Sequence, residues 1–516
     1  MKYEVYFLEG VPFEVEPDKY YYTVLPRSST VLVKTIDDKQ NYSEKRYGFA
    51  DLQEIYKLID EGKEINLNHT YVGGFSLEDY RINRNLDKYS PILLNLSEAR
   101  NAFFDNGGSL EKAMGRESYP KKDVPGYKSV DFSGAQFDEG NVYFFKTQFG
   151  EGNVNFSYAQ FGKGDVHFSG VQFSEGDVSF SRVQFDEGNM YFLNAQFGEG
   201  DVNFSYAQFG KGGVYFREAQ FSKGNVDFSY AQFGKGSVLF LGTQFGKGNV
   251  NFLRTWLGKG SVSISFINNT DEKLEKEFET TITFSSCVFR EHTNMYNIKC
   301  KSLIIENCII EKTLNLESLT ANELSLKNTK NLGQIFIRWK EDKVQKILSG
   351  DTEKDRADQF LMLKENYHAI GRYDEEDEAY VEYKRCQWKA RHAELSKEKK
   401  WLQKIKFLFH WLEKIFFDLM GQYGTSPRNV AYSMGVVFAA FTTLYCTMPS
   451  LLITNGGTQP SRTECISYSI ATFLTIGYGN ITPAHKLAVI LSGVEGFAGV
   501  FLIAYFTVAF ARKVLR

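Results

Sequence analysis

Histidine and cysteine are scarce in this chain of 516 residues, which contains seven His and six Cys. The cysteines form no CxxC pair and show no metal-ligand spacing, so we expect reduced thiols, as in cytosolic or membrane proteins. No nucleophile–base pair or metal cluster stands out, and this argues against an enzyme. The net charge is only −3, so we expect no bulk attraction to nucleic acid.

Three further signals are missing from the sequence. The N-terminus lacks a basic region followed by an apolar run, so we expect no cleaved signal peptide. No apolar segment carries an arginine at every third position, which argues against direct voltage sensing. No glycine fingerprint of a dinucleotide-binding domain occurs. The length nevertheless predicts several domains, because a single core is not expected at this size.

The most conspicuous feature that the chain does have is a twelve-residue repeat from Gly134 to Val262, with the consensus Ala-Gln-Phe-x-x-Gly-x-Val-x-Phe-x-x. A fixed short period predicts a solenoid. The Ala-x-Phe and Val-x-Phe pairs have the period of two that is typical of strands, and we expect both members of each pair to point inward. The glycine marks a turn between them. The Gln position recurs at residues 136, 148, 160, 172, 184, 196, 208, 220, 232 and 244, and Trp256 takes the eleventh place.

The spacing between successive Phe residues alternates between five and seven, and a small residue lies two positions before each Phe. This pattern resembles the pentapeptide-repeat family. The resemblance implies a right-handed, four-sided parallel β-helix in which two twelve-residue units make one coil. We favour this over a two-sided coil of twelve residues, and stacked coils about 4.8 Å apart would then form a rod of about 26 Å.

Charge is distributed unevenly at the glycine corners of the repeat. The residue before each Gly is mostly Glu in the first half and always Lys from residue 211 onward. One interpretation is a solvated edge, and the other is that the basic end faces anionic lipid or an acidic neighbouring subunit. A rod that is half basic differs from the DNA mimics of the pentapeptide-repeat family, which are densely acidic. An unknown cytosolic ligand or protein is the further partner that we consider for the β-helix.

The region after the repeat turns helical. A helix is predicted over residues 352–371, and a second begins near Asp374, with acidic residues in its first turn. This hairpin resembles a single tetratricopeptide-type unit and is interpreted as a packing or tetramerising linker, or as a ligand sensor. Residues 401–420 combine aromatic and basic side chains, which is typical of a helix at the headgroup level, although a plain buried helix has the same pattern.

Two apolar runs near the C-terminus, Val430–Met448 and Leu487–Phe510, have about the length that a membrane-spanning helix needs. Basic residues flank their outer ends. By the positive-inside rule, both termini lie in the cytoplasm of a multi-pass protein of the cell membrane. The flanking bases are Arg428, Arg512, Lys513 and Arg516.

Between these runs, residues 465–474 are predicted to form a half-membrane helix, and Thr475-Ile476-Gly477-Tyr478-Gly479-Asn480 follow directly. Glycine takes left-handed backbone angles without steric cost, so the carbonyl oxygens of residues 475–478 can all turn the same way. Four such segments around one axis would replace the water shell of K⁺.

This segment resembles the Thr-Val/Ile-Gly-Tyr-Gly signature of bacterial potassium channels with two transmembrane helices. The resemblance implies a homotetramer with a filter of Thr475, Ile476, Gly477, Tyr478 and Gly479, in which K⁺ binds at the first four. The usual Asp after the filter is Asn480 here. Pore-helix aromatics brace the filter tyrosine in this family, so Tyr468 or Phe473 is expected to pack against Tyr478.

The second apolar run contains two further candidates. The resemblance implies that Gly499 is the gating hinge, with Gly496 in reserve, and the alternative is close helix packing through small residues. Glu495 is ionisable within the membrane and is therefore a functional candidate. It either forms a structural hydrogen bond behind the filter or attracts cations into the cavity.

The predicted fold is multidomain, with a mixed cap over 1–125, a pentapeptide-repeat-like β-helix over 126–340, a helical linker over 341–425 and an all-α pore domain over 426–516. The predicted function is passive K⁺ conduction by a homotetramer in a lipid bilayer. The alternatives are a weakly selective cation channel and a membrane-anchored scaffold that uses the repeat domain.

Overall fold

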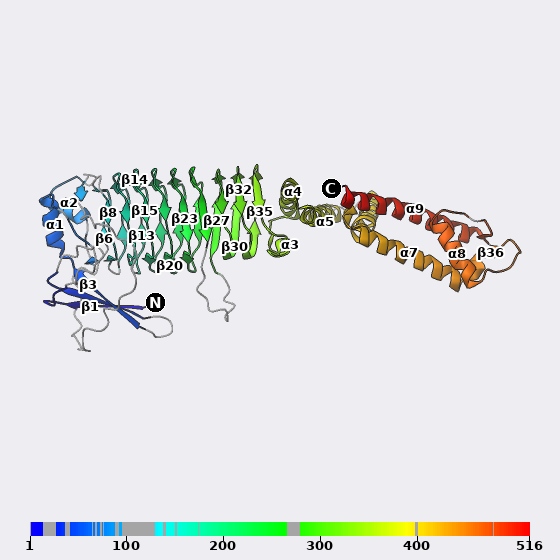
Figure 1. Cartoon of the computed structure of the whole chain (residues 1–516), viewed down its shortest axis with the longest axis horizontal. Helices are drawn as coiled ribbons and strands as arrows, with labels where there is room; N and C mark the ends of the chain where they lie inside the picture. Colours follow the sequence, from blue (N-terminus) through cyan, green and yellow to red (C-terminus); the bar gives the residue numbers. More distant parts are fainter. Residues whose placement is uncertain are drawn as a thin grey trace. The chain divides into compact units, whose positions relative to one another are not determined.

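The computed structural model describes residues 2–13, 27–36, 42–63, 65–67, 70–72, 75, 77–87, 92–94, 130–137, 141–149, 152–173, 175–265, 279–397, 401–477 and 479–515. The chain divides into two compact units, residues 1–349 and 350–516. The first is a β-solenoid that begins with a small mixed region, and the second is helical (Figure 1).

Parallel ladders build the solenoid. One nine-stranded sheet has the order β33 (Thr320–Ser325), β30 (Lys299–Glu306), β27 (Thr281–Ser285), β25 (Val250–Leu253), β21 (Val226–Asp227), β17 (Val202–Asn203), β13 (Val178–Ser179), β10 (Val154–Asn155) and β6 (Val130–Asp131). A second nine-stranded sheet has the order β35 (Gln334–Phe336), β32 (Thr313–Asn315), β29 (Thr293–Asn294), β26 (Val262–Ser265), β23 (Val238–Leu241), β19 (Val214–Tyr215), β15 (Met190–Tyr191), β12 (Val166–His167) and β8 (Val142–Tyr143).

The other two sides are divided into shorter sheets. One side contains β22 (Gln232–Phe233), β18 (Gln208–Phe209), β14 (Gln184–Phe185), β11 (Gln160–Phe161), β7 (Ala135–Phe137) and β5 (Ile92–Leu94), and continues as β28 (Val288–Phe289), β31 (Ile309–Ile310) and β34 (Lys330–Asn331). The last side contains β16 (Gln196–Phe197), β20 (Gln220–Phe221) and β24 (Gln244–Phe245). The solenoid is therefore four-sided, as predicted.

The strand register gives the length of one coil. Val154 pairs with Val178 and Gln160 pairs with Gln184, so each coil in the repeat has two units of twelve residues. This confirms the preferred coil length. After the repeat the coil shortens, because Leu303 pairs with Leu324, 21 residues later.

Stacked phenylalanine rings form the core of the solenoid. Phe156, Phe180, Phe204 and Phe228 are completely buried. Successive rings lie 4.9 to 5.0 Å apart and are parallel within 5°. Each coil places a ring directly on that of the coil below, which explains why the sequence keeps Phe at fixed positions.

The corner glycines are required by the space between coils. An added Cβ at Gly188 or Gly224 would lie 1.9 Å from the carbonyl oxygen of a glycine one coil earlier, Gly164 or Gly200. The sequence predicted a turn there, and the structure adds the close approach of stacked backbones as the physical cause. A second position of the repeat takes positive φ and is mostly occupied by residues with full side chains, such as Tyr206 at 58°.

The N-terminal elements pair with the first coils. An antiparallel sheet of β1 (Lys2–Leu8), β2 (Thr30–Ile36) and β3 (Tyr42–Phe49) continues through β4 (Thr70–Val72) to the solenoid strand β9 (Gln148–Phe149). Two helices, α1 (Leu52–Asp60) and α2 (Leu77–Asn83), belong to the same region, and α3 (Val344–Ile347) follows the last coil.

The second unit begins with a helical hairpin of α4 (Glu353–Ala369) and α5 (Tyr373–Lys397). Thr352 and Asp355 form a capping box at the start of α4, and Gly371 takes a φ of +74° at the turn, as suits a helix end. The remaining elements are α6 (Trp401–Glu413), the π-helix η2 (Lys414–Leu419), the 3-10 helices η3 (Gln422–Gly424) and η4 (Pro449–Leu451), α7 (Pro427–Thr447), β36 (Leu452–Thr454), α8 (Arg462–Phe473), β37 (Ile481–Pro483) and α9 (Lys486–Val514).

Candidate functional site

Helix α8 is short and packs against both long apolar helices, α7 and α9 (Figure 1). A capping box of Ser461 and Glu464 fixes its start. Two clusters hold it in place. The first contains Tyr445, Leu451, Leu452, Cys465 and Ala488, and the second contains Val430, Phe473, Leu502 and Ala509. The strands β36 and β37 pair next to the loop that follows α8.

The loop after α8 has an alternating backbone. Thr475, Gly477 and Gly479 have φ angles of 58°, 67° and 72°, and Ile476 lies between the first two. The Ile476 N–H donates to the carbonyl of Ala471 at 2.7 Å. A β-branched residue at positive φ is strained, and such strain is typical of functional sites. Left-handed angles at these three residues are compatible with the predicted arrangement, and the common direction of the carbonyls stays a prediction.

Most of this loop is exposed within the single chain. Ile476 is 48% exposed. A Cβ added at Gly477 or Gly479 would meet nothing within 4 Å, so their positive φ, and not lack of space, explains the glycines. Tyr478 lies outside the described residues, and so does its predicted contact with Tyr468 or Phe473.

The residues predicted to support the loop occupy separate places. The hydroxyls of Tyr468 and Ser492 are hydrogen-bonded at 2.7 Å, and the Tyr468 ring meets Tyr445 edge-on at 5.3 Å. Phe473 belongs to the second cluster and is 4% exposed. The Asn480 carbonyl accepts a hydrogen bond from the Asn455 N–H at 3.2 Å. Tyr468 thus braces α8 against α9, while Phe473 fixes the end of α8.

Glu495 is fully buried at the contact between α8 and α9. Ser469, also fully buried, donates to its carboxylate at 2.5 Å, and Thr442 donates to Ser469 at 3.0 Å. This chain of hydrogen bonds connects α7, α8 and α9. Glu495 thus forms a hydrogen bond that joins α9 to α8. Its predicted place behind the filter and its alternative role in attracting cations both stay predictions. Sequence reasoning missed Ser469 and Thr442, although hydroxyl side chains within apolar runs were a visible signal.

Gly499 lies where α9 crosses the end of α8. A Cβ at this position would be 1.9 Å from the Phe473 carbonyl oxygen, whereas one at Gly496 would be 3.6 Å from that of Thr472. Helix α9 continues unbroken through both glycines. Close packing is thus a role of Gly499 in this structure, and its role as a hinge stays a prediction.

Helices α7 and α9 are long and apolar enough to cross a membrane. Only 11% and 22% of the residues in their most apolar windows are buried, so most of this apolar surface is available to lipid or to other chains. They are the two such helices among the described residues.

Comparison with known proteins identifies the same region. A family model described as "Ion channel" matches residues 432–516. No curated protein and no solved structure matches the chain. The chain therefore carries a C-terminal ion-channel domain, which follows a β-solenoid and a helical linker in the sequence. The match and the two apolar helices together indicate a membrane protein.

Proposed function

We propose that this chain is one subunit of a homotetrameric potassium channel that conducts K⁺ passively through the loop of residues 475–479. The observation that carries the proposal is the alternation of left-handed backbone angles at Thr475, Gly477 and Gly479 immediately after a short helix. Potassium filters need rings of carbonyl oxygens that replace the hydration shell of the ion. One chain supplies a quarter of each ring, which is why we propose four.

One feature of the domain supports a cation pathway, and another supports assembly in a membrane. The C-terminal end of α8 carries the negative end of the helix dipole and directly precedes the loop. The exposed Ile476 and the exposed apolar face of α9, including Phe497 and Val500, supply surfaces for neighbouring subunits or lipid. In the assembled channel, the K⁺ ions would bind at Thr475, Ile476, Gly477 and Tyr478.

The proposed orientation places both termini in the cytoplasm of the cell. Arg428 precedes most of α7, and Arg512 and Lys513 lie in the last turn of α9. These basic ends favour the cytoplasmic side. The loop would then face outward, and the solenoid would lie inside the cell, where it is available to a cytosolic ligand or protein. We propose no enzymatic activity.

The test is a planar bilayer containing the purified full-length protein under opposed K⁺ and Na⁺ gradients. A reversal potential close to that of K⁺ is the expected result. A potential near zero would indicate a weakly selective cation channel. A silent bilayer would favour a membrane-anchored scaffold.

One substitution assigns the current to the loop. Gly477→Ala is expected to abolish the current or its selectivity, because alanine is disfavoured at a φ of 67°. Gly435→Ala is the matched control, since this glycine lies within α7 and has nothing within 4 Å of an added Cβ. An unchanged K⁺ current in Gly477→Ala would contradict the assignment.

A further inference from the structure

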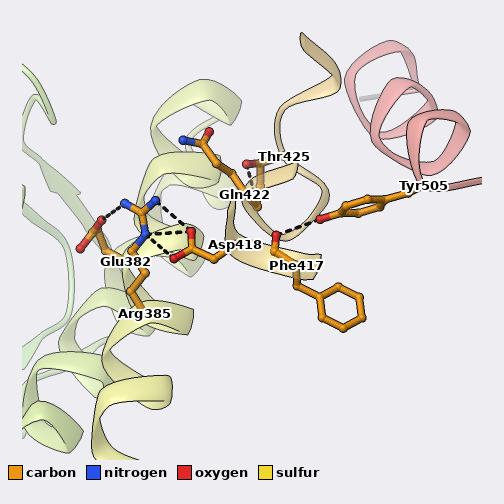
Figure 2. A network of polar contacts seen from close by, with 7 residues as sticks. All are labelled: Glu382, Arg385, Phe417, Asp418, Gln422, Thr425 and Tyr505. Carbon is orange, nitrogen blue, oxygen red and sulfur yellow. Dashed lines mark hydrogen bonds and ion pairs between the residues drawn. The ribbon is translucent and has the colours of Figure 1, made fainter. Parts of the chain in front are cut away.

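Three elements that are distant in sequence meet on the side of the domain where α9 ends: α5, the junction of η2 and η3, and the last turns of α9. Figure 2 shows the first of the contacts between them. Arg385 on α5 donates to Asp418 on η2 from Nε at 3.0 Å and from a terminal nitrogen at 2.9 Å. A second terminal nitrogen donates to Glu382 at 2.9 Å. The side chains of Asp418 and Glu382 are only 12% and 11% exposed.

This contact is stronger than an ordinary surface ion pair. Its geometry brings two nitrogens of one guanidinium to one carboxylate, and it is half-buried, whereas exposed single pairs contribute little. Burial of the guanidinium opposes its charge, but the hydrogen bonds to Asp418 and Glu382 outweigh this and raise the pKa of Arg385. The pair therefore connects α5 firmly to η2.

The second contact connects α9 to the same junction. The Tyr505 hydroxyl donates to the Phe417 carbonyl at 3.0 Å (Figure 2). The Tyr505 ring lies against Gly421 so closely that an added Cβ there would be 2.5 Å from the ring. The lack of a side chain at Gly421 thus leaves the space that the Tyr505 ring occupies.

The third contact connects α9 to α5. Arg512 and Lys513, in the last turn of α9, each form an ion pair with Asp377 at 2.8 Å, and Lys513 also pairs with Asp374 at 2.8 Å. The Asp377 side chain is 6% exposed. The Arg512 guanidinium lies 4.9 Å from the centre of the Tyr380 ring. Acidic residues at the start of α5 and basic residues at the end of α9 also suit both helix dipoles.

The junction itself is strained but firmly held. Gln422 and Tyr423 have φ angles of 48° and 54°, which is costly for two consecutive residues with side chains. Two carbonyls of this segment nevertheless accept hydrogen bonds from side chains. Ser433 donates to that of Met420 at 3.2 Å, and Thr425 donates to that of Gln422 at 2.7 Å (Figure 2). The preceding turn is π-helical, a form that is frequent at functional sites.

We propose that these three contacts form a clamp that fixes the cytoplasmic end of α9 to the helical hairpin, so that any gating movement of α9 carries α5 and the η2–η3 junction with it. The clamp consists of Arg385 with Asp418, Tyr505 with Phe417, and Arg512 and Lys513 with Asp377. Arg385, Tyr505 and Arg512 are positioning residues, since none of them lies in the loop of residues 475–479. The inference rests on the proposed channel function, because it assigns a means of control to the same pore.

The three contacts of the clamp close a ring. Each of the three elements is tied to both of the others by an ion pair or a hydrogen bond, so none can shift without breaking at least two contacts. Helix α9 also forms the close contact with α8 at Gly499. A displacement of α5 is therefore transmitted along a continuous helix to the base of the loop.

The test uses the full-length protein in bilayers and measures the ratio of open to closed time. Arg385→Asp and Asp418→Arg are each expected to change this ratio about tenfold in the same direction, and the double variant should return to within about threefold of wild type. The matched control is Lys389→Glu, because Lys389 pairs with Glu353 within the hairpin, at 3.9 Å and largely exposed. It should leave the ratio unchanged.

Tyr505→Phe tests the second contact with minimal change, since only the hydroxyl is removed. It should shift the ratio in the same direction as the charge variants, whereas Tyr432→Phe, at an exposed position on α7, should not. Single variants with wild-type ratios, a double variant without recovery, or an opposite shift in Tyr505→Phe would each overturn the clamp.

A second measurement separates the clamp from conduction. Amide hydrogen exchange of the same proteins in lipid nanodiscs should become faster in residues 414–424 and 505–515 in each single variant and recover in the double variant. If the wild-type protein conducts no K⁺, the proposed function is wrong. The hydrogen-exchange measurement still tests whether the three contacts hold these segments together. Unchanged exchange in the single variants would overturn the clamp, whether or not the protein conducts.

Discussion

Gly499→Ala distinguishes close packing from free bending of α9. The added methyl group would lie 1.9 Å from the Phe473 carbonyl oxygen. An ordinary carbon–oxygen contact is at least about 3.3 Å, so α9 and the end of α8 must separate by more than about 1 Å. Overpacking of this kind costs about 1–3 kcal/mol. The displaced Phe473 is only two residues from Thr475, so the strained loop should move as well.

Two assays on the purified protein measure the effect. The apparent midpoint of thermal unfolding should fall by about 5 °C, as expected for a loss of about 2 kcal/mol in a unit of this size. The K⁺/Na⁺ reversal potential should shift toward zero. Gly493→Ala and Gly496→Ala are matched controls on the same helix, because an added Cβ meets nothing within 4 Å at the first and only an ordinary contact at the second. If Gly499→Ala were as stable and as selective as these controls, the packing argument would be wrong.

Three other predictions follow from single contacts. Glu495→Leu should destabilise the protein by about 1–3 kcal/mol because it leaves the buried Ser469 hydroxyl without its acceptor, whereas Glu495→Gln should retain most of the stability in thermal unfolding. Gly224→Ala should unfold the solenoid more readily, measured by hydrogen exchange in the repeat, because its Cβ would lie 1.9 Å from the Gly200 carbonyl oxygen. Burial between stacked tyrosine rings holds the pKa of His167 at about 4, below its usual 6.5, although Asp165 opposes the shift. As the pH falls, the unfolded state therefore binds the His167 proton before the folded state does. The contribution of His167 to the free energy of unfolding should be fully present above pH 6.5 and be lost as the pH falls toward 4. His167→Phe should remove this part of the pH dependence of unfolding.

The solenoid was largely predictable because its sequence is periodic. The recurring Phe positions gave the inward face, and the preference for four sides agrees with pairs such as Val154 and Val178. The cause of the corner glycines was not predictable, because it depends on the distance between stacked coils. The residues at positive φ with full side chains, such as Tyr206, were also missed, because their residue types do not indicate that backbone conformation.

The helical unit shows the same division between local and distant information. The hairpin, the two long apolar helices and the short helix before Thr475 follow from local pattern. The clamp does not, because it joins residues as far apart as Asp377 and Lys513, and a single sequence gives no signal for such pairs. The contact of Glu495 with Ser469 was predictable in part. A carboxylate in an apolar helix indicates that a polar partner exists, but it does not indicate which residue that partner is.

The central claim is that four copies of the loop meet on one axis and present their carbonyl oxygens to K⁺. A single-particle structure of the full-length protein in lipid nanodiscs with K⁺ tests it most directly. We expect fourfold symmetry and ion density on the axis between the carbonyls of residues 475–478. A different symmetry, or carbonyls directed away from a common axis, would contradict it.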